Sequence, residues 1–297
     1  MKEDKMDKRF TMKFHATITG QLLREAIADF GISKRALTAI KFGGGEIVVN
    51  GEVQNVRYVL TKGDVVTIKF PEEQASDGLI AEAGELDIVY EDDYLLVINK
   101  PPFISTIPSR EHPSGSVANI ILHHLQKGAV ASTVHVVTRL DRDTSGLMCI
   151  AKHRHIHHLM SEQQKAGMVS REYEALVYGV VQPQSIIAPI GRKETSIIER
   201  EVREDGQFAH TDVRVLQQFQ DEVSHVRLKL FTGRTHQIRV HMSYIGHPLL
   251  GDELYGGRRD VIRRQALHCA YLQFTHPIKK QLMTFESALP EDMRALL

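Results

Sequence analysis

The feature that most constrains the fold is an acidic stretch, residues 71–84, in which hydrophobic residues follow no regular period. Residues 71–100 carry nine acidic side chains and a single basic one, Lys100. Because a stretch without periodic apolar positions cannot present one face to a core, it predicts a linker between two folded parts. We therefore expect a tail over residues 1–11, a small module over 12–70, the acidic linker over 71–84 and a large domain over 85–297.

The module of residues 12–70 has the pattern of two short helices followed by a small sheet. Apolar residues recur at helical spacing from Leu22 to Phe30, and Ser33 is a suitable N-cap for a second helix. Asn50-Gly51, between short apolar runs, predicts a two-residue hairpin turn. The second helix carries three basic side chains, those of Lys34, Arg35 and Lys41.

The large domain mixes strand-like and helix-like segments and contains no internal repeat. Apolar patterning predicts strands over residues 86–89, 95–99, 147–151, 173–177 and 226–230. Helices are predicted over residues 156–166 and 236–245, each followed by a glycine that suits a helix end. Since strands and helices do not alternate strictly, we predict an α+β fold with a mixed or antiparallel sheet rather than a doubly wound sheet.

Composition excludes several classes of protein. Of the 297 residues, 42% are hydrophobic and 25% charged, with 37 basic and 37 acidic side chains, as is typical of a folded globular protein. Two cysteines, Cys149 and Cys269, cannot build a disulfide scaffold, and we expect them to be buried, reduced thiols. No apolar run suits a membrane span, and residues 1–14 lack the apolar core of a signal peptide. We therefore expect a cytoplasmic protein without membrane contact, with a monomer as the default state.

The segment Thr138-Arg-Leu-Asp-Arg-Asp-Thr-Ser-Gly-Leu147 places two carboxylates, Asp141 and Asp143, between two arginines. A turn is one interpretation, because Asp, Thr, Ser and Gly all suit turn positions. A phosphatase-type Asp loop, which would require Mg²⁺, and a glycosidase-like carboxylate pair are enzymatic alternatives. The phosphatase pattern is incomplete, because Arg139 interrupts the apolar strand expected before the first Asp and Ser145 holds the fifth position.

A second unusual segment runs from Gly233 to Met242 and continues to Asp252. Free backbone N–H groups point outward at a helix start, so polar side chains gathered there suit contacts with anions. An ordinary solvated helix face is the alternative. The side chains concerned are those of Arg234, His236, Gln237 and Arg239.

The histidines of residues 153–158 form a candidate metal site, but we do not expect them to bind a metal ion. His153, His155, His157 and His158 have spacings that spread them around a helix start. The sequence also lacks the His-Glu-x-x-His pattern that brings two histidines to one helix face. Phosphate contacts or structural roles are the favoured interpretation.

Together, the two unusual segments resemble a known family. Arg139-Leu-Asp-Arg-Asp-Thr-Ser-Gly-Leu147 followed by Gly233-Arg-Thr-His-Gln-Ile-Arg-Val-His-Met242 looks like a pseudouridine synthase of the RluA/RluD type, which acts on large-subunit ribosomal RNA. Three further motifs stand in the matching order, so the resemblance spans residues 85–290: Leu86-Asp-Ile-Val-Tyr-Glu-Asp92, Val97-Ile-Asn-Lys-Pro-Pro102 and Arg171-Glu-Tyr-Glu-Ala175. The N-terminal module is similar to an S4 RNA-binding domain through Ile32-Ser-Lys-Arg35 and Ile47-Val-Val-Asn-Gly51.

The resemblance implies a reaction and three catalytic residues. A uridine's N1–C1′ bond would be broken, the base turned over and rejoined through C5, with no cofactor, metal or ATP. Asp141 matches the family's catalytic aspartate, acting as nucleophile or as base. Arg239 matches the buried arginine that keeps this carboxylate charged, with Arg234 as the alternative. Tyr173 matches the active-site tyrosine, which stacks on the base and is a candidate for proton transfer from C5.

The resemblance also implies contacts with RNA. The target uridine must leave its stack, and Arg139 matches the residue that fills the vacated space. The other predicted RNA-binding residues are Arg142, Arg234, His236 and Gln237 in the large domain and Lys34, Arg35 and Lys41 in the S4-like module. The family usually has His before the arginine that matches Arg139, whereas this chain has Thr138.

The partner implied is a structured RNA, with 23S ribosomal RNA first and transfer RNA as the alternative. A catalytically silent RNA-binding or ribosome-assembly factor is the competing hypothesis, which the retained catalytic residues argue against. Residues 225–265 carry eight basic and three acidic side chains, which predicts salt-sensitive RNA binding. We expect this basic surface to include Arg258, Arg259, Arg263 and Arg264.

Overall fold

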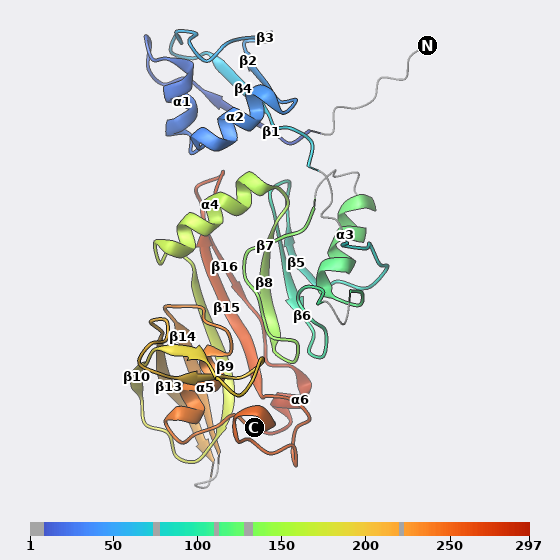
Figure 1. Cartoon of the computed structure of the whole chain (residues 1–297), viewed down its shortest axis with the longest axis vertical. Coiled ribbons are helices and arrows are strands. Elements are labelled where there is room, and N and C mark those ends of the chain that lie inside the picture. The colour runs from blue at the N-terminus through green and yellow to red at the C-terminus, as the bar shows by residue number, and fades with distance from the viewer. Residues whose placement is uncertain (1–8, 74–77, 110–112, 128–132, 220–222) are drawn as a thin grey trace.

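A computed structural model describes residues 9–73, 78–109, 113–127, 133–219 and 223–297. Within these residues, one hydrophobic core lies under a small N-terminal sheet and a second lies in a large domain built on a long sheet (Figure 1). Phe10 and Ile278 pack against both cores. None of the helices in the described ranges has both the length and the apolarity of a membrane-spanning segment.

The N-terminal module combines two helices with an antiparallel sheet of strand order β1-β4-β2-β3. Leu23 of the first helix and Ile40 of the second are fully buried, together with Val66 and Ile68 of the sheet. The elements are β1 (Thr11–His15), α1 (Leu23–Asp29), α2 (Lys34–Phe42), β2 (Glu46–Val49), β3 (Glu52–Val53) and β4 (Val65–Lys69).

The predicted local signals of this module are present. The Ser33 hydroxyl caps α2 by accepting a hydrogen bond from the Ala36 N–H at 3.2 Å. Asn50 and Gly51 have φ values of 51° and 92°, the positive values that a two-residue turn between β2 and β3 requires. Strand β1 was not predicted, because only two of its five residues are buried and charged residues precede it.

The large domain is built on a mixed sheet of strand order β10-β13-β14-β9-β15-β8-β6-β5, with β16 paired to β15 and β7 to β8. Every neighbouring pair in the described residues is antiparallel except β8 with β15, which is parallel. The strands are β5 (Ile88–Glu91), β6 (Leu95–Lys100), β7 (His135–Val136), β8 (Ser145–Ala151), β9 (Ser170–Tyr178), β10 (Gln184–Ile187), β13 (His210–Phe219), β14 (Val223–Leu230), β15 (Leu267–Thr275) and β16 (Leu282–Glu286).

Helices cover the ends and sides of this sheet (Figure 1). They are α3 (Val117–Lys127), α4 (Arg154–Lys165), α5 (Gln237–Tyr244), the 3₁₀-helix η1 (Glu253–Tyr255) and α6 (Glu291–Arg294). A separate hairpin pairs β11 (Ile190–Arg192) with β12 (Arg200–Val202). Mixed pairing together with separate helices confirms the predicted α+β class.

The five predicted strands of this domain are present, but the sequence did not predict two long ones, β13 and β15. Strand β15 is buried at six of its nine positions, including the first four in succession, so the alternation that reveals a half-buried strand is confined to its second half. Strand β13 loses its buried residues after Val213. The two cysteines, Cys149 on β8 and Cys269 on β15, are buried and unpaired, as predicted.

Gly146 allows β8 and β15 to approach each other. Its φ is 114°, and a Cβ atom at this position would lie 2.4 Å from the carbonyl oxygen of Cys269 and 2.5 Å from its nitrogen. No side chain can be accommodated there without moving the backbone of β15. Since Gly146 directly follows the segment Thr138–Ser145, the parallel pairing sets the position of that segment.

Two histidines of the 153–158 cluster contact the N-terminal module. Phe10 stacks on His153 with ring centroids 4.2 Å apart, and Phe70 stacks on His155 at 5.1 Å. Glu73, in the linker region, lies 3.2 Å from the Nε2 atom of His153. Within the described ranges, no three His, Cys, Asp or Glu side chains are grouped so that they could hold a metal ion.

Replacing Gly146 with Ala is expected to lower the free energy of unfolding by at least about 3 kcal/mol, because the new Cβ collides with backbone atoms. Urea denaturation measures the loss. Gly167→Ala is the matched control: its φ is also positive, at 70°, but the space around it is open. The free energy of unfolding of that variant should fall by only about 1 kcal/mol. Equal decreases in the two variants would contradict the close approach of β8 and β15 at Gly146.

Candidate active site

Asp141 lies in the loop between β7 and β8, which neighbouring hydroxyls hold in place. The Thr106 hydroxyl donates to the Leu140 carbonyl at 2.6 Å and accepts from the Leu140 N–H at 3.3 Å. Thr138 is buried, and its hydroxyl accepts from the Cys149 N–H at 2.9 Å. Thr138 therefore secures the start of the loop from within the fold, at the position where the resemblance led us to expect His.

A buried lysine supports the same loop from β6. The Lys100 ammonium group is 1% exposed and donates to three carbonyl oxygens, including that of Arg142 at 2.9 Å. Burial lowers the pKa of Lys100 to about 7, and the nearby carboxylates of Asp143 and Asp141 act in the opposite direction. Lys100 thus fixes the backbone one residue after Asp141.

Arg264 corrects one of our predictions, because it is fully buried and cannot belong to an RNA-binding surface. Its guanidinium makes a two-pronged pair with Asp292 of α6, at 2.7 and 2.9 Å, and donates to the Asp143 carbonyl at 3.2 Å. It joins the C-terminal helix to the loop that carries Asp141. The other three arginines of the predicted surface are exposed, namely Arg258, Arg259 and Arg263.

Arg239 of α5 lies between two carboxylates. Its Nε and Nη2 atoms donate to the two oxygens of Asp252, both at 2.7 Å, and its Nη1 atom donates to Asp141 at 3.2 Å. The Asp252 side chain is 1% exposed and that of Asp141 29% exposed. The hydrogen bonds and charges of Asp252, followed by Asp141, outweigh burial and raise the pKa of Arg239, so it remains a cation. Arg239 is thus anchored by the buried carboxylate and presents one remaining donor to the accessible carboxylate.

Asp252 is a residue to which the sequence analysis gave no role. It lies just before η1, thirteen positions after Arg239, in the continuation of the second unusual segment. The signal that could have identified it is a carboxylate placed directly after Gly251 and before the helical turn. Only the packing of this turn against α5 brings it to the guanidinium.

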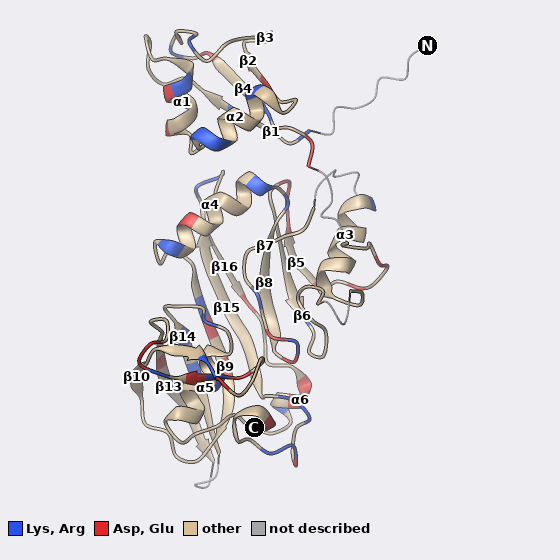
Figure 2. Cartoon of the chain, viewed as in Figure 1, with Lys and Arg blue, Asp and Glu red and all other residues tan. Residues whose placement is uncertain are grey.

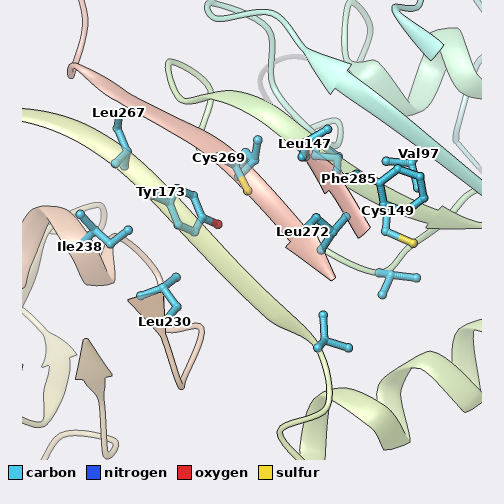
Figure 3. Packing of buried hydrophobic residues seen from close by; sticks show 14 of the residues in the cluster. Val97, Leu147, Cys149, Tyr173, Leu230, Ile238, Leu267, Cys269, Leu272 and Phe285 are labelled. Carbon is cyan, nitrogen blue, oxygen red and sulfur yellow. The ribbon is translucent and has the colours of Figure 1, made fainter. Parts of the chain in front are cut away.

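Tyr173 of β9 forms one wall of the cavity at Asp141. It is 4% exposed, and Figure 3 shows its ring among Leu230, Ile238 and Leu267 with the hydroxyl directed toward Cys269. Burial, and then the neighbouring thiol, raise the pKa of this hydroxyl. The ring therefore lines the cavity, and the hydroxyl is directed toward Cys269 in the protein interior.

His236 precedes α5 and reaches the same cavity. It adopts a left-handed conformation with φ of 57°, which few residues other than glycine tolerate. Its Nδ1 atom hydrogen-bonds with the Tyr255 hydroxyl at 2.8 Å, and its Nε2 atom lies 3.9 Å from Asp141. Burial lowers the pKa of His236, and the neighbouring Asp141 acts in the opposite direction. The ring thereby contributes a polar group beside the Asp141 carboxylate.

Gln237 is placed differently from our prediction of an RNA contact. It is 3% exposed, and its amide nitrogen donates to the His210 carbonyl at 3.0 Å and the Thr211 hydroxyl at 2.9 Å. Its amide oxygen accepts from the Thr232 hydroxyl and from the Arg234 N–H. With both ends of the amide engaged inside the protein, Gln237 supports the loop before α5.

The remaining predicted residues divide between two regions. Arg139 is exposed and lines both the cavity at Asp141 and an adjacent groove, which Arg234 also lines. Arg142 is exposed and lies 3.6 Å from Asp143. The three basic residues of the N-terminal module, Lys34, Arg35 and Lys41, are exposed on α2.

A family model described as RNA pseudouridylate synthase matches residues 94–244, a region that includes Asp141, Tyr173 and Arg239. The chain belongs to this family. It is 56% identical over 277 residues to the Bacillus subtilis protein named uncharacterized RNA pseudouridine synthase YjbO, covering 93% of this chain and 98% of that protein. It is 40% identical over 294 residues to ribosomal large subunit pseudouridine synthase D of Pseudomonas aeruginosa, covering 94% and 91%.

Solved structures agree with this assignment. The chain resembles human RNA pseudouridylate synthase domain containing 1 with a TM-score of 0.58 and 29% identity, over 70% of this chain and 86% of that one. The structure of human RNA pseudouridylate synthase domain containing 4, at 23% identity and a TM-score of 0.56, shares the fold. The pseudouridine synthase is therefore an isomerase that acts on RNA, and the phosphatase and glycosidase interpretations of Asp141 and Asp143 are set aside.

Replacing Asp252 with Asn should weaken both the fold and the catalytic step. The change leaves a buried guanidinium with half its compensating charge, so the free energy of unfolding should fall by about 3 kcal/mol. Displacement of Arg239 should lower the single-turnover rate about 100-fold. Urea denaturation and single-turnover pseudouridine formation measure the two effects.

Asp260→Asn is the matched control for this prediction, because Asp260 pairs with Arg258 at 3.2 Å on the surface. Exposed pairs contribute little, so neither the denaturation midpoint nor the rate should change measurably. A normal rate in the folded Asp252→Asn enzyme would show that Asp252 does not position Arg239.

Proposed function

We propose that this pseudouridine synthase isomerises uridines in large-subunit ribosomal RNA, with Asp141 as the catalytic carboxylate. The observation that carries the catalytic assignment is the ion pair between Arg239 and Asp141 at a cavity walled by the ring of Tyr173. The relatives named as ribosomal large subunit pseudouridine synthase D support the choice of substrate.

In this proposal, the target uridine leaves its stack and enters the cavity beside Asp141. The Asp141 carboxylate acts at the ribose while the Tyr173 ring stacks on the base. Arg139, exposed at the mouth of the cavity, takes the place of the base in the RNA. Its planar guanidinium can both stack on bases and contact phosphate, which suits this role.

Replacing Asp141 with Asn should abolish the reaction, because the amide can neither attack nor accept a proton. Release of tritium from RNA labelled at uridine C5 measures turnover, with EDTA present throughout. We expect release with wild type on ribosomal RNA and at least about 10³-fold slower release with Asp141→Asn. Asp143→Asn, in the same loop, is the control and should stay within about threefold of wild type.

Transfer RNA, tested in parallel, distinguishes the substrates. Release from transfer RNA alone would overturn the proposed ribosomal substrate and leave the catalytic assignment intact. Equal rates for wild type and Asp141→Asn would overturn the catalytic assignment.

We further propose that the N-terminal module binds RNA as an S4-like domain. Figure 2 shows basic residues on α1 and α2 of this module, and those of α2 are Lys34, Arg35 and Lys41. All three side chains are exposed on one short helix, where they can contact phosphates.

Replacing Lys34, Arg35 and Lys41 together with Glu should raise KM about tenfold and leave the rate at saturating RNA unchanged, because these residues act only in binding. The slope of log KM against log salt should become shallower by about two to three. The control replaces Lys127, Lys165 and Arg294 with Glu, which changes the net charge equally at exposed sites outside this module. Equal effects of the two triple variants would contradict a specific role for α2.

A further inference from the structure

One arginine beside the active site has no partner within the described residues. Arg171 lies on β9 two positions before Tyr173, so the two side chains project from the same face of the strand. Its Nε atom is buried and makes no hydrogen bond, and in the described part of the chain its guanidinium forms neither a hydrogen bond nor an ion pair. A partly buried cation in this state is costly unless an anion or a carbonyl group binds to it.

The other charged residues of β9 are paired. Glu172 binds Arg227 at 2.7 Å and Glu174 binds His225 at 2.8 Å, both across to β14. These side chains project from the opposite face of β9, since positions alternate along a strand. Arg171 is therefore the charged residue of this strand that is left available to a ligand.

Arg171 lies in the wall between two cavities. One is the catalytic cavity at Asp141, and the second, of about 350 Å³, lies between the end of α4 and the end of β14. Arg171, Leu230 and Gly233 line both cavities. A Cβ atom at Gly233 would lie 2.8 Å from an Nη atom of Arg171, so the absence of a side chain at Gly233 makes room for the guanidinium.

The second cavity has the properties of a site for an unpaired nucleotide. Phe231 lines it with a side chain that is 50% exposed, and His210 stacks on one face of the ring, with centroids 4.3 Å apart and an interplanar angle of 13°. The Lys229 ammonium group lies 5.4 Å from the same ring. An aromatic face flanked by cations is the arrangement that stacks unpaired bases and follows the phosphate backbone. Its volume falls within the roughly 300–1,000 Å³ of typical ligand sites.

We propose that this second cavity binds the nucleotide adjacent to the target uridine. Phe231 stacks on the base of that nucleotide, and Arg171 binds the phosphate that joins it to the uridine. The inference rests on the proposed function, because it assumes that the uridine occupies the cavity at Asp141. Two cavities that share one wall suit two consecutive nucleotides, whose shared phosphate must lie between them.

The two contacts have different consequences for recognition. A guanidinium can bind a phosphate through two parallel hydrogen bonds, which fixes the position of the strand at that phosphate. Stacking on Phe231 accepts any base, because every base has an aromatic face. The site therefore holds the strand in register with Asp141 and tolerates any base at the neighbouring position.

The test uses a synthetic RNA hairpin that spans a uridine converted by the wild-type enzyme. In two derivatives, one phosphate flanking this uridine, 5′ or 3′, is replaced by an uncharged methylphosphonate. Binding of each hairpin is measured with wild type, Arg171→Met, Gly233→Ala and Arg214→Met. The Gly233 variant keeps the charge of Arg171 but displaces the guanidinium, and Arg214 is an exposed arginine of β13 that lines neither cavity.

One of the two methylphosphonates should weaken wild-type binding about tenfold, the loss expected for a charged hydrogen bond. Arg171→Met and Gly233→Ala should bind the unmodified hairpin about tenfold more weakly and show no further loss with that derivative. Arg214→Met should respond as wild type does. An abasic nucleotide on the same side of the uridine should likewise weaken wild-type binding about tenfold. It should not weaken binding by the Phe231→Leu variant any further.

Full additivity of the methylphosphonate and Arg171→Met losses, for both flanking phosphates, would overturn the proposal. So would full additivity of the abasic nucleotide with Phe231→Leu. Conversion of the unmodified hairpin by wild type establishes the proposed function separately, so the failure of the second site and the failure of that function produce different results.

Discussion

The active site depends on one buried cation that is shared by two carboxylates. A guanidinium in the protein interior is stable only when its hydrogen-bonding groups and charge are matched. Asp252 supplies that match for Arg239 with two bonds at 2.7 Å, and the geometry leaves one nitrogen to bind Asp141. The Asp252 pair therefore fixes the guanidinium that binds Asp141, the carboxylate to which we assign catalysis.

Two buried basic side chains hold the backbone around Asp141. Lys100 binds the carbonyl of Arg142, and Arg264 binds that of Asp143. Their elements, β6 and the segment before β15, flank β8 in the sheet. Because Gly146 lets β8 and β15 approach closely, the sheet sets the position of the loop. Figure 2 shows charged residues of both signs among these elements.

Arg171 contrasts with the other charged residues of β9. Its neighbours Glu172 and Glu174 on β9 are paired within the protein, whereas its own guanidinium faces two cavities and has no partner in the part of the chain that the structure describes. Among the described residues, one group of cations is buried with its acceptors, and a second group, for which we propose contacts with RNA, is accessible or unpaired. Arg264 and Arg239 belong to the first group, and Arg139 belongs to the second.

The sequence by itself determined the α+β class, the cap at Ser33, the Asn50-Gly51 turn and the catalytic motifs, because each depends on residues adjacent in the chain. It could not reveal that Arg264 is buried. Arg264 lies in a run of basic residues, and nothing in that run indicates that Asp292, far away in the chain, pairs with it.

Only the tertiary structure identified Asp252 as the partner of Arg239 and showed that the Tyr173 hydroxyl is directed toward Cys269. It also placed Arg171 between two cavities with no partner among the described residues. Strand β15 was not predicted for a related reason, because its first four positions are all buried and give no alternating pattern. Local sequence patterns indicate the secondary structure that each segment favours, whereas the pairing of buried charges depends on segments that meet only after the chain has folded.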